Sequence, residues 1–419
     1  MGSTTVVTSA ALVVDADTVI LGGWLAFSGD EIVGCGAPGE LEGRFQRASR
    51  WDFSDLILLP AFVNAHTHLC FSHLRHRVPF RDTFTAWLIE VGATALSDSD
   101  DAFAAATREG AAECMRTGTA AVGDATPRWG IWGTLDESGL GGVLFLEVFG
   151  FGGAGSENTV GQLERELPEL AAKHLGVGVS PHAPYTADAQ TYRDCAAFAR
   201  ANDMRLMTHL AETAEEVELL QHGHGPLADF FNLRAAPLGA SWQPPGMSPI
   251  AYAASLGALG PTTLIAHANY VSSEDIGMMA DAGAHVAFCP RSHAFFRHPR
   301  HPVEEFLSAG INVALGTDSL ASNDSLSMLE EMRDLRQRHP AIQPHVALRM
   351  ATENGAKALG IESRYGTLAP GKSASFVAIR PAGKAQVTRE TAMGAALEGE
   401  AEIEASLIAG KRMPADEER

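Results

Sequence analysis

Residues 60–69 read Pro60-Ala-Phe-Val-Asn-Ala-His66-Thr-His68-Leu69, an apolar run that ends in a His-x-His pair. In an extended strand, residues two apart project to the same side, so both imidazoles can reach one point, as metal ligands do. A His-x-His pair also arises by chance, and a second one stands at His222 and His224. The pair alone therefore leaves a metal site and an ordinary structural role open.

The segment that follows this pair has the periodicity of an α/β fold. From about residue 60 to 360, short apolar runs rich in β-branched residues alternate with longer Ala-, Leu- and Glu-rich segments of helical period. Such alternation indicates parallel strands joined by crossover helices, and eight units predict a closed (β/α)8 TIM barrel. The predicted strands are 61–64, 119–123, 143–149, 177–180, 205–208, 262–266, 285–288 and 312–316.

Both ends of the chain are rich in short strands bounded by turns. Ser28-Gly-Asp30 is a hairpin signal between two of them, and neither end has enough strands to bury a core of its own. We therefore expect the termini to pair into one small β-sandwich, with domains at 1–59, 60–362 and 363–419. The predicted strands at the two ends are 11–14, 23–27, 31–34 and 52–59, and then 365–379 and 405–411.

Composition excludes several classes of protein. A chain of 419 residues that is 46% apolar and 20% charged can bury a large core, so we expect a globular, soluble protein. A formal charge of −20 repels nucleic acid and anionic membranes, so neither is expected as a partner. The first twenty residues contain no Lys or Arg, so a cytoplasmic location is predicted. A homodimer and a monomer both remain open.

The cysteines indicate neither a disulfide framework nor a thiolate zinc site. There are five, an odd number, and no two are spaced Cys-x-x-Cys. Most are therefore predicted to be thiols of the core: Cys35, Cys70, Cys114, Cys195 and Cys289.

Polar or ionisable residues follow almost every predicted barrel strand. One histidine in such a place is usually structural, but active sites of this fold are built at the carboxyl ends of the strands, and convergence of several groups favours a site. These groups are His66 and His68, Asp124, Glu147, His182, His209, His267, Cys289 with Ser292, and Asp318. Other histidines fall in predicted loops and helices and are interpreted as surface residues: His73, His76, His222, His224, His298 and His301.

Four of the strand-end groups form a plausible ligand set for a metal. His66, His68, His209 and Asp318 supply three imidazoles and one carboxylate, which suit zinc, or alternatively ferrous iron, with a position open for water. A binuclear site would need a bridging ligand from the fourth strand. Lys173 precedes that strand and His182 stands at its end, so we expect one divalent metal ion.

These motifs resemble those of the amidohydrolase superfamily, in its mononuclear branch of cytosine-, guanine- and adenosine-type deaminases and related chlorohydrolases. The resemblance extends over nearly the whole chain. It implies that water activated by the metal attacks an amino-bearing ring carbon and that ammonia leaves. The motifs are Pro60-Ala-Phe-Val-Asn-Ala-His-Thr-His68, Pro181-His-Ala-Pro-Tyr-Thr186, Thr208-His-Leu-Ala-Glu212, Ala266-His267, Leu315-Gly-Thr-Asp-Ser319 and Gly366-Thr-Leu-Ala-Pro-Gly-Lys372.

The resemblance also implies roles for three residues. Asp318, as ligand and neighbour of the water, would accept its proton. Glu212, three positions after His209, would act as general acid toward a ring nitrogen, and His267 would donate to the developing alkoxide or steady the water. An alternative for Glu212 is a helix-start residue favoured by the helix dipole.

Within this family the chain is most similar to the aminodeoxyfutalosine deaminases of menaquinone biosynthesis. The motifs concerned are Phe84-Thr-Ala-Trp87-Leu, Cys289-Pro-Arg-Ser-His-Ala-Phe-Phe296 and Gly316-Thr-Asp-Ser-Leu-Ala-Ser-Asn323. The predicted substrate contacts are Trp87, His182, Arg291 and Ser319. His293 replaces an Asn found in many relatives.

A substrate with an aryl carboxylate would need a cation, which Arg291, Arg297 or Arg300 could provide, although plain solvation explains these arginines equally well. Deamination of adenosylhomocysteine, guanine or a pterin, or dechlorination of a triazine, would use the same metal set. A non-enzymatic barrel is disfavoured because every expected ligand is present.

Overall fold

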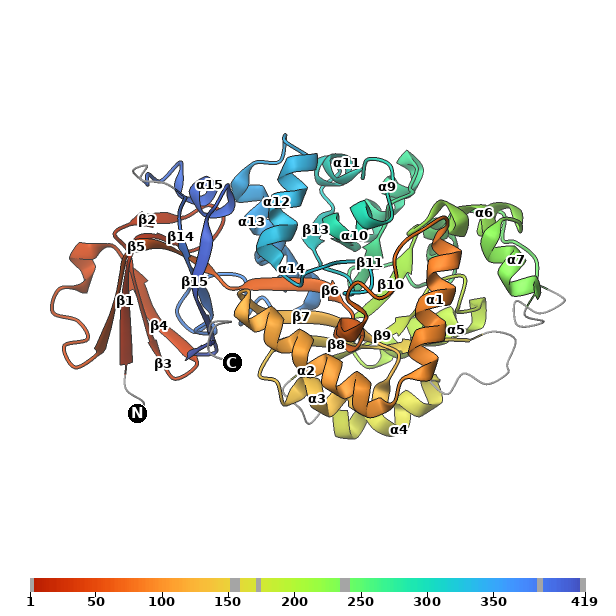
Figure 1. Ribbon diagram of the computed structural model, residues 1–419, viewed down its shortest axis with the longest axis horizontal. Coiled ribbons are helices and arrows are strands. Elements are labelled where there is room, and N and C mark those ends of the chain that lie inside the picture. Colours follow the sequence, from red (N-terminus) through yellow and green to blue (C-terminus); the bar gives the residue numbers. More distant parts are fainter. Residues whose placement is uncertain (1–3, 151–158, 171–174, 234–241, 383–386, 415–419) are drawn as a thin grey trace.

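The computed structural model describes residues 4–150, 159–170, 175–233, 242–382 and 387–414 (Figure 1). At its centre, an eight-stranded sheet runs in chain order, and each strand is parallel to the next. The (β/α)8 barrel is thus confirmed, with a strand at each of the eight predicted places. The strands are β6 (Phe62–Thr67), β7 (Thr119–Thr126), β8 (Gly141–Val148), β9 (Gly176–Pro181), β10 (Leu206–Leu210), β11 (Thr263–His267), β12 (His285–Phe288) and β13 (Asn312–Leu315).

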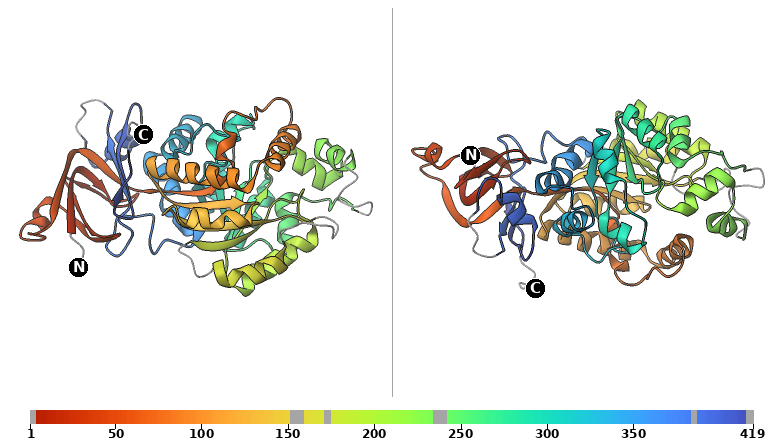
Figure 2. Two further views of the ribbon diagram at one scale, coloured as in Figure 1. Left: turned by 60° about the horizontal axis from the view of Figure 1, so that its bottom comes forward. Right: turned by 90° about the horizontal axis from the view of Figure 1, so that it is seen from above.

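Helices connect the strands and surround the barrel (Figure 2). Within the described ranges, no helix is both long and apolar enough to cross a membrane. The helices are α1 (Phe84–Ser97), α2 (Asp100–Arg116), α3 (Trp132–Asp136), α4 (Val160–Leu170), α5 (Ala189–Ala201), α6 (Ala214–His222), α7 (Pro226–Leu233), α8 (Pro249–Ser255), α9 (Ser273–Ala282), α10 (Pro290–Phe295), α11 (Val303–Ser308), α12 (Met328–Arg338), α13 (Pro344–Ala351), α14 (Glu353–Leu359) and α15 (Ala392–Leu397). Short 3-10 helices span Pro38–Leu41, Leu69–Leu74 and Trp129–Ile131.

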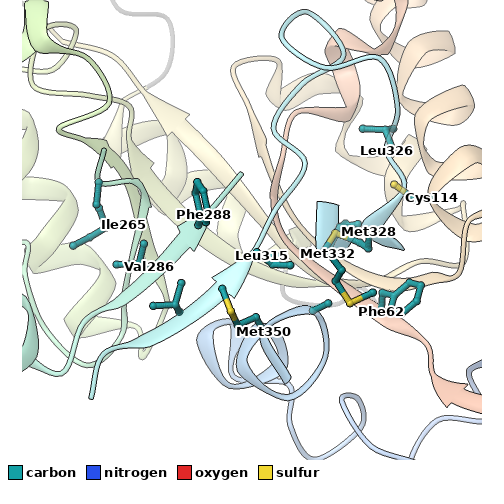
Figure 3. Close-up of a cluster of buried hydrophobic side chains, with 14 of the residues drawn as sticks. Phe62, Cys114, Ile265, Val286, Phe288, Leu315, Leu326, Met328, Met332 and Met350 are labelled. Carbon is teal, nitrogen blue, oxygen red and sulfur yellow. The ribbon is translucent and has the colours of Figure 1, made fainter. Parts of the chain in front are cut away.

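Side chains between the strands and the outer helices form the largest apolar core. Phe62 of β6 and Leu315 of β13 pack with the methionines of α12 and α13, as Figure 3 shows for Met328, Met332 and Met350. All five are fully buried. Because unbranched methionine side chains adapt to irregular gaps, they suit the curved space between a barrel and its helices.

Hydrogen bonds at their carboxyl ends join β6 and β13, the two end strands of the parallel sheet. Asn64 donates from Nδ2 to Thr317 Oγ1 (2.7 Å) and accepts from the Thr317 amide (3.1 Å). The amides of Thr317 and Asp318 both donate to the carbonyl of His66, each at 3.1 Å. Thr67 Oγ1 donates to the Asp318 carbonyl at 3.0 Å. The barrel is therefore closed at the point where its first and last strands deliver His66 and Asp318.

This closure requires glycine at position 316. A Cβ added to Gly316 would lie 2.7 Å from the His66 carbonyl oxygen and 3.0 Å from the His66 Cβ. Gly123 of β7 approaches the same strand, since its added Cβ would lie 2.3 Å from the Ala65 oxygen. Both contacts are closer than a real Cβ permits, so any larger residue would push β6 away from its neighbours.

Strands from both termini form one mixed sheet beside the barrel, so the two ends of the chain pair as predicted (Figure 1). β14 joins the two ends because it pairs antiparallel with β5. The module consists of β1 (Thr4–Val13), β2 (Val19–Leu21), β3 (Trp24–Ser28), β4 (Glu31–Gly36), β5 (Ser49–Pro60), β14 (Phe376–Arg380), β15 (Glu402–Ile408) and β16 (Lys411–Arg412).

The terminal sheet curls around a core of its own. Phe27 of β3 makes edge-on ring contact with Phe376 of β14 at 6.3 Å, although β5 and β1 lie between these strands in the sheet order. The Ile32 amide also donates to the Lys372 carbonyl at 2.9 Å. The sheet thus buries apolar side chains between its two halves, as a sandwich does. The domain limits at 59/60 and 362/363 stay predictions.

Candidate active site

The four predicted metal ligands converge at the carboxyl ends of the barrel strands, which point away from the terminal sheet (Figure 1). His66 is in β6, His68 follows that strand, His209 is in β10, and Asp318 follows β13 by three residues. Each side chain belongs to a residue more than nine-tenths buried. The register between β6 and β7 shifts between Asn64 and Thr67, and such irregularities re-aim side chains at functional sites.

The donor atoms of these residues have the spacing of ligands around one ion. His68 Nε2 lies 3.3 Å from His209 Nε2. Asp318 Oδ1 lies 3.7 Å from His66 Nε2 and 3.8 Å from His68 Nε2. Two ligands about 2.1 Å from a tetrahedral zinc ion are about 3.4 Å apart. These three pairs therefore have nearly the separation of ligands around one ion, and the donor atoms of His66 and His209 also lie within 4.8 Å of each other.

The protonation states of the cluster also suit a cation. Burial lowers the pKa of His66, His68 and His209, so their imidazoles are neutral and their lone pairs are available. Burial opposes ionisation of Asp318, whereas positive charge at the neighbouring His267, His66 and His68 and the hydrogen bond from Ser292 lower its pKa below the ordinary value. With neutral imidazoles, a bound cation would supply that positive charge. His66 Nε2 is buried and has no hydrogen-bond partner among the described residues. Three neutral nitrogens and one carboxylate thus fit a divalent metal.

Surrounding groups orient the candidate ligands. His209 Nδ1 lies 3.0 Å from the carbonyl of His182 and donates to it, which directs His209 Nε2 toward the cluster. Asp318 Oδ2 accepts hydrogen bonds from Ser292 (2.7 Å) and Ser322 (2.8 Å). These bonds leave the other carboxylate oxygen, Oδ1, facing His66 and His68.

Two residues at the site have strained backbones that specific hydrogen bonds hold in place. His267 has φ +73° and Asp318 has φ +56°, in the left-handed region that costs a non-glycine residue about 1–3 kcal/mol. The carbonyl of His267 lies 3.0 Å from His301 Nε2, and that of Asp318 accepts from Thr67 at 3.0 Å. Strain of this kind is typical of residues aimed into a reactive centre.

Glu212 and His267 lie side by side next to the ligand cluster. His267 Nε2 is 3.6 Å from Glu212 Oε1, and Tyr185 donates its hydroxyl proton to Glu212 Oε2 at 3.2 Å. Burial, together with Asp318 and Glu216, raises the pKa of Glu212 well above its usual value. Burial lowers the pKa of His267 to about 4. The pair thus combines a carboxyl whose raised pKa favours its protonated form with an imidazole that is neutral at pH 7.

Glu147, one of the strand-end groups that the sequence predicted to converge, also lies at the site. Its Oε1 lies 4.0 Å from His68 Nδ1 and 3.9 Å from His182 Nε2. Burial, and then the charges of Asp124 and Asp318, raise the pKa of Glu147 to about 8. Two overlapping groups also have donor atoms within 4.8 Å of one another, one with Glu147 beside His68 and His209, the other with His267 beside His66 and His209.

The predicted substrate contacts are only partly gathered at this centre. His182 contacts Thr186 through Nδ1 (2.5 Å) and packs its ring against His209 (4.8 Å). Ser319 is buried directly after Asp318. Trp87 of α1 is 8% exposed and packs its ring edge-on against Phe296, so little of its surface remains open.

Of the three arginines named above, Arg291 and Arg300 form ion pairs with carboxylates. Arg291 is ion-paired with Asp324 and lies 3.9 Å from Glu330. Arg300 is ion-paired with Glu304 at 2.5 Å. Arg297 is exposed and forms no ion pair with any residue that the structure describes. Arg291 also borders a surface pocket with a volume of about 510 Å³.

One prediction about the other histidines is wrong. His301 was expected at the surface, but it is fully buried, stacks on Phe288 at 3.7 Å and bonds to the His267 carbonyl. Pairing of a loop residue with the barrel is a tertiary contact that periodicity does not reveal. His298 is half-buried and contacts Tyr270 (3.0 Å), whereas His222 is exposed as expected. Lys173 lies outside the described residues.

Comparisons with known proteins agree with this geometry. The sequence matches the Amidohydrolase family over residues 57–413. It is 29% identical to the aminodeoxyfutalosine deaminase of Deinococcus radiodurans over 81% of this chain and 81% of that protein. It is 30% identical to the 5-methylthioadenosine/S-adenosylhomocysteine deaminase of Teredinibacter turnerae over 77% of this chain and 71% of that protein. The solved structure of Helicobacter pylori aminofutalosine deaminase with methylthio-coformycin aligns with a TM-score of 0.83 at 25% identity, over 98% of this chain and 100% of that one.

The ligand set predicts the metal content of the purified protein. We expect about one equivalent of zinc or iron per chain, and loss of that metal in His66→Ala or His209→Ala, because each removes one of four donors. Elemental analysis of desalted protein measures this. His222→Ala is the matched control, since it belongs to the exposed His-x-His pair. Two tightly bound equivalents, or loss of metal in the control, would contradict the assignment.

Proposed function

Because the chain belongs to the amidohydrolase family, we propose that it is a metal-dependent hydrolytic deaminase of an adenine-type nucleoside. The proposal rests on one observation: the buried histidine and aspartate side chains that could bind a metal lie next to the Glu212 and His267 pair. Hydrolysis of a cyclic amidine needs a water nucleophile, a proton donor for the ring nitrogen, and a group that stabilises the developing oxygen charge. The site offers a candidate for each.

His66, His68, His209 and Asp318 would hold one divalent ion, zinc by preference and iron as the alternative. When bound, the ion supplies a nucleophile at neutral pH, because coordination lowers the pKa of water from 15.7 toward about 7. The carboxylate of Asp318 has a depressed pKa and therefore stays ionised as a ligand. Asp318 would also take up the proton that the water loses, and Ser292 and Ser322 orient its carboxylate through Oδ2.

Glu212 would protonate the ring nitrogen of the substrate. Its raised pKa favours the protonated carboxyl, the form that a general acid requires. Tyr185 bonds to Oε2, so Oε1 is the atom from which the proton would be delivered. His267 has a buried Nε2 without a hydrogen-bond partner among the described residues, and this nitrogen would stabilise the developing oxygen charge.

His182, Ser319 and Trp87 would contact the nucleoside. His182 is neutral because burial lowers its pKa to about 3, so it can bind an uncharged heterocycle through a hydrogen bond without adding charge. Its ring stacks on Phe149 at 4.9 Å, which fixes the plane of the imidazole. We propose these contacts as substrate determinants, together with Arg291, whose side chain borders the neighbouring pocket.

Aminodeoxyfutalosine, an intermediate of menaquinone biosynthesis, is the first candidate substrate. The relative from Deinococcus radiodurans and the sequence motifs around Trp87 and Cys289 support it. 5-Methylthioadenosine or S-adenosylhomocysteine is the second candidate, favoured by the Teredinibacter turnerae relative and by the ion pairs that occupy Arg291 and Arg300. Binding of an aryl carboxylate would then depend on Arg297 or on displacement of one of these pairs.

A panel of nucleosides tests the function and separates the two candidates. We expect the absorbance change from adenine to hypoxanthine with aminodeoxyfutalosine, at a higher kcat/KM than with 5-methylthioadenosine or S-adenosylhomocysteine. Guanine and a chlorinated triazine complete the panel, with ammonia and chloride release as readouts. Activity confined to guanine or to chloride release would refute the nucleoside assignment. A preference for methylthioadenosine would transfer it to the second candidate.

Glu212→Gln tests the acid role. The amide keeps the shape of the side chain but has no acidic proton, so turnover should fall about a hundred- to ten-thousandfold while metal content and substrate affinity change little. Steady-state kinetics with elemental analysis of the same preparation measures both. Near-normal turnover with unchanged metal would move the acid to another group of the site, such as Glu147 or His182.

A further inference from the structure

The turn that carries Glu212 is unusual in its backbone. It links β10 to α6, and Ala211 within it has φ +51°, in the left-handed region that residues with a Cβ disfavour. The direction of the Glu212 side chain depends on this turn, because Glu212 follows Ala211 directly. A strained turn keeps its conformation only where the surrounding structure holds it.

Glu216, in the first helical turn of α6, forms hydrogen bonds to the backbone of the segment that links β10 to α6. One of its carboxylate oxygens accepts a hydrogen bond from the Ala211 amide (3.0 Å), and the other accepts from the Glu212 amide (2.9 Å). Glu216 is fully buried, so water cannot replace either bond. Both oxygens of one carboxylate are therefore used to fix two successive peptide groups.

Two further contacts complete the restraint on Glu212. Asn269 donates from Nδ2 to the Glu212 carbonyl at 2.9 Å, and Tyr185 donates to Oε2 at 3.2 Å. Every polar group of Glu212 except Oε1 is thus engaged, and Oε1 faces His267. Asn269 and Tyr185 each bind Glu212 alone. Glu216 binds two backbone amides, those of the strained residue Ala211 and of Glu212.

We propose that Glu216 is a positioning residue that sets the reach of the Glu212 carboxyl by clamping the amides of residues 211 and 212. This inference rests on the proposed role of Glu212 as proton donor. A glutamine at position 216 keeps one acceptor oxygen and turns an NH2 group toward the second amide, so one of the two bonds becomes a contact between donors. Displacement of a reacting group by about 1 Å can cost about a hundredfold in rate.

The test combines Glu216→Gln with Glu212→Gln in a double-mutant cycle. Glu216→Gln alone should lower kcat about 30- to 100-fold, with KM and metal content changed by less than about threefold, on the displacement argument. In the Glu212→Gln background, Glu216→Gln should cause almost no further loss, because the group it positions no longer donates a proton. Equal losses in both backgrounds would show a general structural role and overturn the proposal.

Hydrogen exchange supplies a readout that does not depend on turnover. The amides of residues 211 and 212 should exchange faster in Glu216→Gln than in the unmodified protein, while amides of the other barrel strands are unchanged. Unchanged exchange at both amides would contradict the clamp. Glu216→Asp is the second variant if the glutamine protein does not fold, since it keeps the carboxyl group but is too short to reach both amides, and it should show the same non-additivity.

Asp275→Asn is a matched control for loss of a buried helix-start carboxylate. Asp275, in the first turn of α9, accepts from the Ser272 amide and hydroxyl, both at 2.9 Å, and from the Ser248 hydroxyl. Among the described residues it has no hydrogen bond to a residue of the site. This variant should lose stability but keep kcat. If the unmodified protein deaminates no adenine nucleoside, the proposed function fails. If the unmodified protein does deaminate an adenine nucleoside but the losses in the two variants are additive, only the proposed role of Glu216 is refuted.

Discussion

The hydrogen bonds between the carboxyl ends of β6 and β13 are the constraint on which the site depends. The His66 carbonyl accepts from two successive amides, Thr317 and Asp318, and Gly316 allows the strands to approach because a Cβ there would collide with His66. Strands that close a barrel in this way bring residues distant in sequence to one rim. Thr67 of β6 also donates to the carbonyl of Asp318, which has a left-handed backbone conformation. The contacts that close the barrel therefore also position the carboxylate of Asp318, a candidate metal ligand.

The rim separates its carboxyl groups into distinct protonation states. Asp318 faces three imidazoles and the Ser292 hydroxyl and has a lowered pKa, whereas burial, and then neighbouring carboxylates, raise the pKa of Glu212 and Glu147. Opposite shifts of nearby carboxyls are how one site supplies both a base and an acid at a single pH. Two glutamates in the first turn of α6 bind backbone amides near the site. Glu216 accepts from the Glu212 amide, and Glu215 accepts from the amides of Phe84 and Thr85 at the start of α1.

The sequence could predict the barrel and its polar rim because both follow from local patterns. Strand and helix periods repeat eight times, and a residue that follows a buried strand must lie at the rim, which placed His66, His209 and Asp318 together. Contacts between distant segments leave no such pattern. Burial of His301 beneath His267 and the ion pair of Arg291 with Asp324 arise only once loops pack on the barrel. The hydrogen bonds of Glu216 to the amides of residues 211 and 212 leave no such pattern either, because a glutamate at a helix start is ordinarily explained by the helix dipole.

Anomalous X-ray diffraction at the zinc absorption edge, from crystals of the purified protein, tests the central claim most directly. The account predicts one strong peak within about 2.1 Å of the Nε2 atoms of His66, His68 and His209 and of Asp318 Oδ1. It also predicts that Glu212 lies outside the coordination sphere of that ion. A second peak of similar strength, a peak beside His222 and His224, or direct coordination by Glu212 would contradict the account.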